Sequence, residues 1–370
     1  MSGIVDDDRQ MTDDFLGKGV DALPTPALVA QDELLDENIE LLANYFASRE
    51  CRLRPHFKSH KCVTLARRQL EAGGANGITC AKLSEAEQLV AGGVDDVLIA
   101  NQIVGADKAR RLAQLNMSAT VRVAVDSMKH LAELGAAARE ADVTIGVLVE
   151  VDIGMKRCGV APGQAAVDLA HHAAETDGLH FDGLQAYEGH LVTKFSFEER
   201  KEKVVEAMKP LQETIRSLAS CGMRPFIVSS GGTGTYDITG NIEGIKEIQA
   251  GSYALMDASY RKVRPEFKVA RYVLAAIISA SGNRAVADVG AKGLGMEFGL
   301  PELVDKPDAK VLYCAEEHTV IENISANVGD RIRLIPSHGC TTNNLYRRMW
   351  VTDDGTIEEV WPIEGAGCLE

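Results

Sequence analysis

GITCAKLSEAEQLVAGGVDDVLIAN, residues 77–101, contains in one short stretch the two patterns from which a β/α fold is built. Residues 77–82 and 96–101 are short apolar runs typical of buried strands. Residues 83–92 between them carry apolar side chains at the helical spacing of about 3.6 residues. A strand, a helix and a second strand in this order predict a parallel β-α-β unit.

The same alternation continues on both sides of this stretch. Helical patterns occur, for example, at residues 106–115, 127–140 and 197–219. Strand-like runs occur at residues 52–57, 77–82, 96–101, 120–126, 144–153, 181–188, 226–231 and 247–256. Eight strands alternating with helices predict a parallel (β/α)8 barrel of the TIM type. An open doubly wound sheet is the alternative architecture.

The pattern changes at about residue 269. Short alternating runs follow without a long helix between them, at residues 275–281, 283–288, 310–314, 331–336, 348–351 and 356–361. We therefore expect an α/β protein with a barrel over residues 25–265 and a mostly antiparallel β domain over residues 266–370. A strand at 27–31, followed by a helix at 33–48, could join either part.

Composition narrows the class of protein. The chain has 370 residues and a formal net charge of −15, which argues against a nucleic-acid partner and against a basic membrane-binding face. No segment approaches the roughly 20 apolar residues of a membrane helix. Residues 1–15 lack a signal-peptide pattern, and the cysteines form no CxxC pair. These features favour a cytoplasmic enzyme.

A lysine lies in the motif RPHFKSHK, residues 54–61, at the end of the first predicted barrel strand. The carboxyl ends of barrel strands face the active site. Lys58 is flanked by His56 and His60, and neighbouring cations with desolvation depress the pKa of an ammonium group. Lys58 is therefore a candidate Schiff-base former, and a solvated basic loop is the alternative.

A glycine-rich turn, SSGGTGT at residues 229–235, directly follows another predicted strand. Backbone N–H groups of glycines and the hydroxyls of Ser or Thr can surround a phosphate without a basic cluster. An acidic protein can hold an anion in this way. An ordinary turn is the alternative interpretation.

The segment PSHGCTT, residues 336–342, contains a His-x-Cys pair. On an extended segment His338 and Cys340 would project from one face, and their nitrogen and sulfur donors suit Zn²⁺. Two buried structural side chains are the alternative. Two more predicted strand ends carry polar groups, VEVDIGMKRCGV at 149–160 and LQAYEGH at 184–190.

Taken in order, these motifs resemble one enzyme family. The series is RPHFKSHK (54–61), AKLSEAE (81–87), VEVDIGMKRCGV (149–160), LQAYEG (184–189), SGGTGTY (230–236), EIQAGSYALMD (247–257) and PSHGCTTNNLY (336–346). It is similar to the D-threonine aldolases and eukaryotic-type D-serine dehydratases. These are pyridoxal-phosphate enzymes with an alanine-racemase-like barrel and a β domain, and the resemblance spans residues 25–361.

The resemblance implies a role for each matching residue. Lys58 would bind the cofactor covalently, Arg157 would lie near its phenolic oxygen, and Tyr187 would lie beside its ring. The implied cofactor-binding residues are Lys58, His56, Arg157, Tyr187, Ser230, Gly232, Thr233, Gly234, Gln249, Gly251, Ser252 and Tyr253. Lys58, Tyr187 and His190 are the implied catalytic residues. His338 and Cys340 would bind a divalent metal (Mn, Mg or Zn).

Two positions depart from the aldolase pattern. Aldolases of this type usually have an aspartate where this chain has Cys340, and His-x-Cys is the pattern of the dehydratases. Aldolases also tend to have a histidine, a proposed base, where this chain has Thr193. The nearest histidine is His190.

The leading hypothesis is a lyase that cleaves β-hydroxy-D-amino acids by a retro-aldol reaction to glycine and an aldehyde. The main alternative is a D-serine or 3-hydroxy-D-amino acid dehydratase, which forms a keto acid and ammonia. A racemase would need a second base, for which Tyr346 or Cys340 would have to serve. A non-catalytic pyridoxal-phosphate carrier would lack the β domain. The resemblance also implies a homodimer acting on a small D-amino acid.

Overall fold

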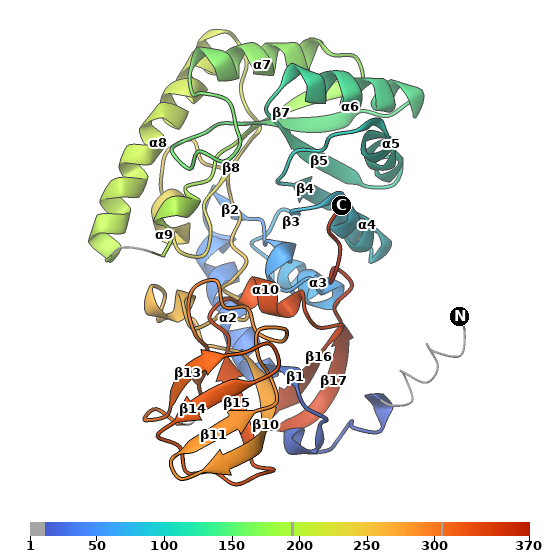
Figure 1. The fold of residues 1–370 in the computed structure, drawn as a ribbon. Coiled ribbons are helices and arrows are strands. Elements are labelled where there is room, and N and C mark those ends of the chain that lie inside the picture. The colour runs from blue at the N-terminus through green and yellow to red at the C-terminus, as the bar shows by residue number, and fades with distance from the viewer. Residues whose placement is uncertain (1–11, 194–195, 305) are drawn as a thin grey trace. The chain divides into compact units, whose positions relative to one another are not determined.

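The computed structural model describes residues 12–193, 196–304 and 306–370 (Figure 1). The chain forms two compact units. The barrel unit comprises residues 41–58, 65–251 and 368–370, and the β unit comprises the residues up to 40, residues 59–64 and residues 252–367.

Eight parallel strands form the barrel unit, as predicted. Their order in the sheet is β2-β9-β8-β7-β6-β5-β4-β3, which is the sequence order read around a ring. Isolated parallel bridges join Leu53 to Ala75 and His56 to Thr79, between the segments of β2 and β3, and so close the ring. The open-sheet alternative is therefore wrong. The strands are β2 (Arg52–Leu53), β3 (Ile78–Cys80), β4 (Asp96–Ile99), β5 (Thr120–Val125), β6 (Ile145–Glu150), β7 (Leu179–Gln185), β8 (Ile227–Ser230) and β9 (Glu247–Ile248).

Helices α4 to α8 lie on the outside of these strands (Figure 1). In α4 the buried residues include Leu83, Ala86 and Leu89, which recur every three residues along one face. The helices are α2 (Asp32–Ala47), α3 (Val63–Glu71), α4 (Leu83–Ala91), α5 (Ala106–Leu115), α6 (Met128–Glu140), α7 (Gln164–Glu175), α8 (Phe197–Ser220) and α9 (Tyr236–Thr239). No helix in the described ranges is both long and apolar enough to cross a membrane.

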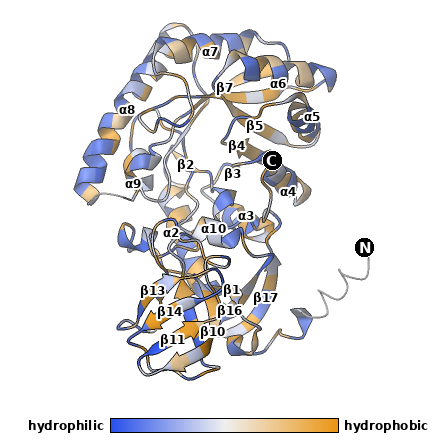
Figure 2. Ribbon diagram, viewed as in Figure 1, coloured by the Kyte–Doolittle hydropathy of each residue, from blue (hydrophilic) through white to orange (hydrophobic). Residues whose placement is uncertain are grey.

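The β unit contains a mostly antiparallel sheet in the order β13-β14-β11-β10-β1-β16-β17, and β15 pairs with β10 and β12. Figure 2 shows hydrophobic residues along β11 and β14. A core cluster that includes Leu23, Val29, Tyr272, Leu274 and Trp350 packs the sheet. The elements are β1 (Ala27–Gln31), β10 (Arg271–Ser281), β11 (Arg284–Ala287), β12 (Glu302–Leu303), β13 (Lys310–Cys314), β14 (Thr319–Glu322), β15 (Arg331–Ile335), α10 (Gly339–Asn343), β16 (Arg348–Asp353) and β17 (Thr356–Pro362).

The structure settles one point that the sequence left open, and it differs from the sequence prediction in two others. Strand β1 joins the β unit, where it pairs antiparallel with β10 and parallel with β16. Two short strands, β12 and β14, were not predicted. The predicted strand 247–256 is shorter than expected and ends after Ile248. Beyond this residue the chain still makes single backbone hydrogen bonds, such as that from the His56 N–H to the Ala250 carbonyl, but no regular strand pairing.

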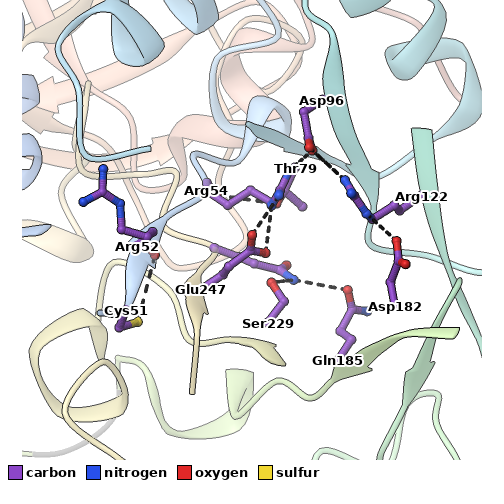
Figure 3. A network of polar contacts seen from close by, with 11 residues as sticks. Cys51, Arg52, Arg54, Thr79, Asp96, Arg122, Asp182, Gln185, Ser229 and Glu247 are labelled. Carbon is purple, nitrogen blue, oxygen red and sulfur yellow. Dashed lines mark hydrogen bonds and ion pairs between the residues drawn. The ribbon is translucent and has the colours of Figure 1, made fainter. Parts of the chain in front are cut away.

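Charged side chains cross-link five strands of the barrel unit (Figure 3). Arg54 donates two hydrogen bonds to Glu247, at 2.7 and 2.8 Å, and one to Asp96 at 2.6 Å. Arg122 donates to Asp96 at 2.8 Å and to Asp182 at 2.5 Å. We call these five residues the ion-pair ladder. Arg54 links the end of β2 to β9 and β4, and Arg122 on β5 links β4 to β7.

The ladder needs a small residue beside it. A Cβ atom on Gly146, in β6, would clash with the Asp182 carboxylate and press on the Arg122 side chain. The sequence analysis assigned no role to these charges, whose partners lie far apart in the chain.

Replacing Arg54 with methionine will destabilise the protein by about 3–5 kcal/mol, because the buried Glu247 carboxylate loses its partner. Urea denaturation measures the change. The control is Arg110→Met, which removes an exposed ion pair with Asp107 on α5 and should cost about 0–1 kcal/mol. Equal losses of stability in the two variants would contradict the role of the ladder.

Candidate functional site

The carboxyl ends of the barrel strands carry most of the residues that the sequence singled out. Lys58 follows β2, Arg157 lies in the loop after β6, Tyr187 follows β7, and the glycine-rich turn follows β8. Parallel strands end at one edge of a barrel, so these groups share that edge.

Lys58 lies in a single 3-10 turn, Phe57–Ser59, directly after β2. Its backbone N–H donates to Nδ1 of His56 at 3.5 Å, and the Cys62 N–H donates to Nδ1 of His60 at 3.2 Å. These two contacts hold the backbone of the segment that carries Lys58.

The Tyr187 ring lies where side chains from three strand ends meet. Lys58 Nζ is 5.9 Å from the ring centroid, and Arg157 Cζ is 5.8 Å from the same centroid. A Cβ atom on Gly232 would lie 3.5 Å from the ring carbon Cε2. The structure therefore brings together Lys58, Arg157 and Tyr187, three residues from different parts of the sequence.

Glu188 holds the glycine-rich turn, and the sequence analysis missed it. Its fully buried carboxylate accepts hydrogen bonds from Ser230 Oγ and the Gly231 N–H, both at 3.3 Å. It also accepts from Thr235 Oγ1 at 2.6 Å and Thr239 Oγ1 at 2.5 Å. A buried carboxylate needs such donors, and here they fix both ends of the turn. The sequence signal was an acidic residue at a predicted strand end, among other polar groups.

Two glycines of this turn have no room for a side chain. Gly231 has a φ of 71°, in the left-handed region. A Cβ atom on Gly234 would clash with the carbonyl oxygen of Val192. The buried residues Thr233 and Gly234 are thus held close to the loop after β7. Such close approach of backbone N–H groups is what a phosphate cradle requires.

Of the candidate residues after β9, Gln249 and Gly251 belong to the barrel unit, and Ser252 and Tyr253 belong to the β unit. The Gln249 side chain donates to Gln185 Oε1 at 3.1 Å and to Ser229 Oγ at 2.9 Å, across the ends of β7 and β8. Gly251 is buried. Ser252 and Tyr253 belong to the β unit, where the fully buried Tyr253 ring packs against Phe267, with 5.9 Å between the ring centroids.

The loop after β6 winds around an aspartate. The Asp152 carboxylate accepts backbone hydrogen bonds from Gly154 at 2.9 Å and Lys156 at 3.0 Å. Burial opposes its ionisation, but these hydrogen bonds outweigh burial and lower the pKa of Asp152. This turn places Arg157 next to the buried Glu150, 3.8 Å from its carboxylate. Burial raises the pKa of Glu150, although Gln102 donates a hydrogen bond to it.

His190 lies in the 3-10 turn Gly189–Leu191 after β7. A Cβ atom on Gly154 would lie 3.4 Å from the imidazole atoms Cε1 and Nε2. The other nitrogen, Nδ1, is buried and has no hydrogen-bond partner among the described residues.

The His-x-Cys pair is not on an extended segment, so that prediction was wrong. His338 is extended, but it caps the short helix α10, and Cys340 is the second residue of that helix. Burial opposes protonation of His338, yet the interactions with Cys340, Glu297 and Asp257 raise its pKa.

Two buried charges hold the turn of α10. The Asp257 carboxylate accepts the Gly339 N–H at 2.9 Å. The buried Arg271 guanidinium donates to the Gly339 carbonyl at 3.1 Å and to Asn343 Oδ1 at 2.8 Å. A Cβ atom on Gly339 would clash with this guanidinium. Cys340 Sγ donates to Ser59 Oγ at 3.4 Å.

The His338–Cys340 pair offers one nitrogen and one sulfur donor, a set that fits Zn²⁺ better than Mg²⁺ or Mn²⁺. Across the described residues there is no group of three or more His, Cys, Asp or Glu side chains that could hold a metal ion. An ion at this pair would therefore need further ligands from water or a bound substrate.

Family models match both parts of the chain. The model described as the alanine racemase N-terminal domain matches residues 32–258, and a putative serine dehydratase domain matches residues 270–352. The chain is 36% identical to the 3-hydroxy-D-aspartate aldolase of Paracoccus denitrificans, over 95% of this chain and 96% of that protein. It is 35% identical to the D-threonine aldolase of an Arthrobacter species, over 93% of both proteins.

Comparison with a solved structure points to the same enzyme family. The D-threonine aldolase from Filomicrobium marinum is 36% identical and superimposes with a TM-score of 0.94, covering 96% of this chain and 99% of that one. The chain therefore belongs to the alanine-racemase-like family of pyridoxal-phosphate enzymes that includes the D-threonine aldolases and D-serine dehydratases.

Proposed function

We propose that this chain is a lyase that cleaves β-hydroxy-D-amino acids to glycine and an aldehyde, using pyridoxal phosphate and a divalent metal ion. The observation that carries the choice of reaction is the 36% identity to a 3-hydroxy-D-aspartate aldolase over 95% of the chain. The structure supports it with a lysine, an arginine and a tyrosine that converge beside a glycine-rich turn.

The cofactor fits the barrel strand ends. Lys58 would hold it covalently, Tyr187 would face its ring, and Arg157 would donate to its phenolic oxygen. Ser230, Gly232, Thr233 and Gly234 would bind the phosphate through N–H groups and hydroxyls, with the turn held by Glu188. When bound, the cofactor accepts the electron pair left on the substrate Cα. His56, Gln249, Gly251, Ser252 and Tyr253 complete the proposed set.

His190 is the proposed base. In the cleavage the β-hydroxyl loses its proton, the Cα–Cβ bond breaks, and Cβ leaves as the aldehyde carbon. The proton from the hydroxyl would pass to His190, which lies in the 3-10 turn after β7. The Cα of the remaining fragment takes up a proton to give glycine. Thr193, half-buried, takes the place of the histidine usual in aldolases.

His338 and Cys340 would hold the divalent metal, which would supply Lewis-acid polarisation of the substrate hydroxyl. The metal site would lie in the β unit, and the lysine that binds the cofactor, Lys58, lies in the barrel unit. We also propose that the protein acts in the cytoplasm and as a homodimer, in line with its composition and its family.

A second candidate function is β-elimination from D-serine or a 3-hydroxy-D-amino acid. The observation that favours it is Cys340, two residues after His338, since His-x-Cys is the pattern typical of the dehydratases. A soft nitrogen and sulfur pair suits Zn²⁺ acting on a departing hydroxide.

The cofactor proposal is tested by Lys58→Ala. We expect the visible absorbance band of the bound cofactor to disappear, together with the label left on Lys58 by borohydride, because no amine remains to hold the cofactor. The control is Lys310→Ala, at an exposed position on β13. A band that persists in Lys58→Ala would exclude this lysine.

The role of Glu188 is tested by Glu188→Gln. The amide nitrogen replaces one of the two carboxylate oxygens and cannot accept, so the turn loses either the hydrogen bonds from Thr235 and Thr239 or those from Ser230 and Gly231. We expect the dissociation constant of pyridoxal phosphate to rise about tenfold or more. Glu243→Gln, an exposed carboxylate before β9, is the control. An unchanged cofactor affinity with a lowered melting temperature would show that Glu188 stabilises the fold but does not support cofactor binding.

Product analysis separates the two reactions. D-threonine, D-phenylserine, D-serine and D-3-hydroxyaspartate are each incubated with the cofactor-loaded enzyme, and glycine, aldehyde, keto acid and ammonia are measured. We expect glycine and aldehyde, lost after EDTA treatment and restored by Mn²⁺, Mg²⁺ or Zn²⁺. Keto acid and ammonia without glycine would establish the dehydratase instead.

A further inference from the structure

His338 is held on two sides by a single loop of the β unit, the connection between β11 and β12. Glu297 Oε2 lies 3.2 Å from His338 Nδ1. The next residue, Phe298, lies against the same imidazole, with 4.5 Å between the ring centroids and 36° between the ring planes. One contact therefore engages a ring nitrogen, and the other covers a ring face.

The carboxylate of Glu297 also reaches the helix that carries Cys340. Thr341 Oγ1 donates to Glu297 Oε2 at 2.8 Å, and Thr341 is the residue directly after Cys340. The same carboxylate oxygen therefore contacts the His338 ring, before helix α10, and the Thr341 hydroxyl, within that helix. Glu297 in this way links His338 to the residue that follows Cys340.

This arrangement fixes the chemistry of the imidazole. A carboxylate oxygen can only accept, so Nδ1 must carry the proton when it bonds to Glu297. In the neutral ring, which is the form that binds a metal, the lone pair is then on Nε2. A ligating histidine commonly donates its other N–H to a carboxylate in this way, which sets its tautomer and its orientation.

We infer that Glu297 is a positioning residue for the metal: it presents Nε2 of His338 as the donor and sets the ring against Cys340. This inference rests on the proposed metal site at His338 and Cys340. It assigns a function to a residue outside every motif that the sequence analysis identified. Because the Glu297 side chain is 48% exposed, its replacement leaves the packing of the β unit intact.

Metal affinity tests the inference without reference to catalysis. Zn²⁺ is titrated into the metal-free holoenzyme against a competing chelator. For Glu297→Ala we expect a loss of affinity of about 10–100-fold, the range typical when the carboxylate behind a ligating histidine is removed. Glu297→Gln should lie between wild type and Glu297→Ala, because its amide oxygen still accepts the N–H. Thr341→Val should weaken binding less than Glu297→Ala.

A matched control separates orientation from simple charge. Glu316→Gln removes one exposed carboxylate between β13 and β14 in the same unit, and it should leave Zn²⁺ affinity unchanged. Substitution with Co²⁺ gives a second measurement, the absorbance of the metal–thiolate bond to Cys340. We expect this band to broaden or weaken in Glu297→Ala at saturating Co²⁺, because the coordination geometry is no longer held.

The possible outcomes distinguish this inference from the proposed function. Wild-type affinity and an unchanged Co²⁺ spectrum in Glu297→Ala would overturn the role of Glu297 and leave the proposed metal site intact. Equal losses in Glu297→Ala and Glu316→Gln would also overturn it, since charge alone would then explain the effect. A wild-type enzyme that binds no metal would remove the metal from the proposed function and this inference with it.

Discussion

The buried guanidinium of Arg54 is the interaction on which the barrel depends. Strand β2 has only two residues, and isolated bridges and a hydrogen bond from Thr79 Oγ1 to the Arg54 carbonyl join its segment to that of β3. Arg54 adds side-chain links between this short strand and its neighbours, with two hydrogen bonds to Glu247 on β9 and one to Asp96 on β4. Lys58 follows Arg54 by four residues, so the group that closes the ring also places the proposed cofactor lysine.

Buried carboxylates organise the loops of both proposed sites. Glu188 gathers hydroxyls and an N–H of the glycine-rich turn, and Asp257 accepts an N–H in the turn of His338 and Cys340. Each is satisfied by several donors, which makes a buried negative charge tolerable. This explains how a chain with a net charge of −15 can offer an anion site: acidic groups hold the scaffold, and N–H groups and hydroxyls remain for the ligand.

Local patterns predicted the elements well where the hydrophobic period was clear. The helix expected at 106–115 is α5, Ala106–Leu115, and each predicted barrel strand overlaps an observed one. The prediction failed where a contact distant in sequence decides the structure. Glu188 is 47 and 51 residues from Thr235 and Thr239, and Glu297 is 41 residues from His338. No pattern within a single segment indicates such partners.

By itself the sequence determined the strand and helix alternation, the change to a β unit, and the motifs that carry Lys58, Tyr187 and His338. Periodicity and motifs are local properties, so they can be read along the chain. The tertiary structure alone decided that β1 joins the β unit, that Arg54 pairs with Glu247 193 residues away, and that Cys340 lies on a helix. These outcomes depend on which surfaces pack together, because a buried charge or an unpaired strand edge is stable only against a partner that folding brings to it.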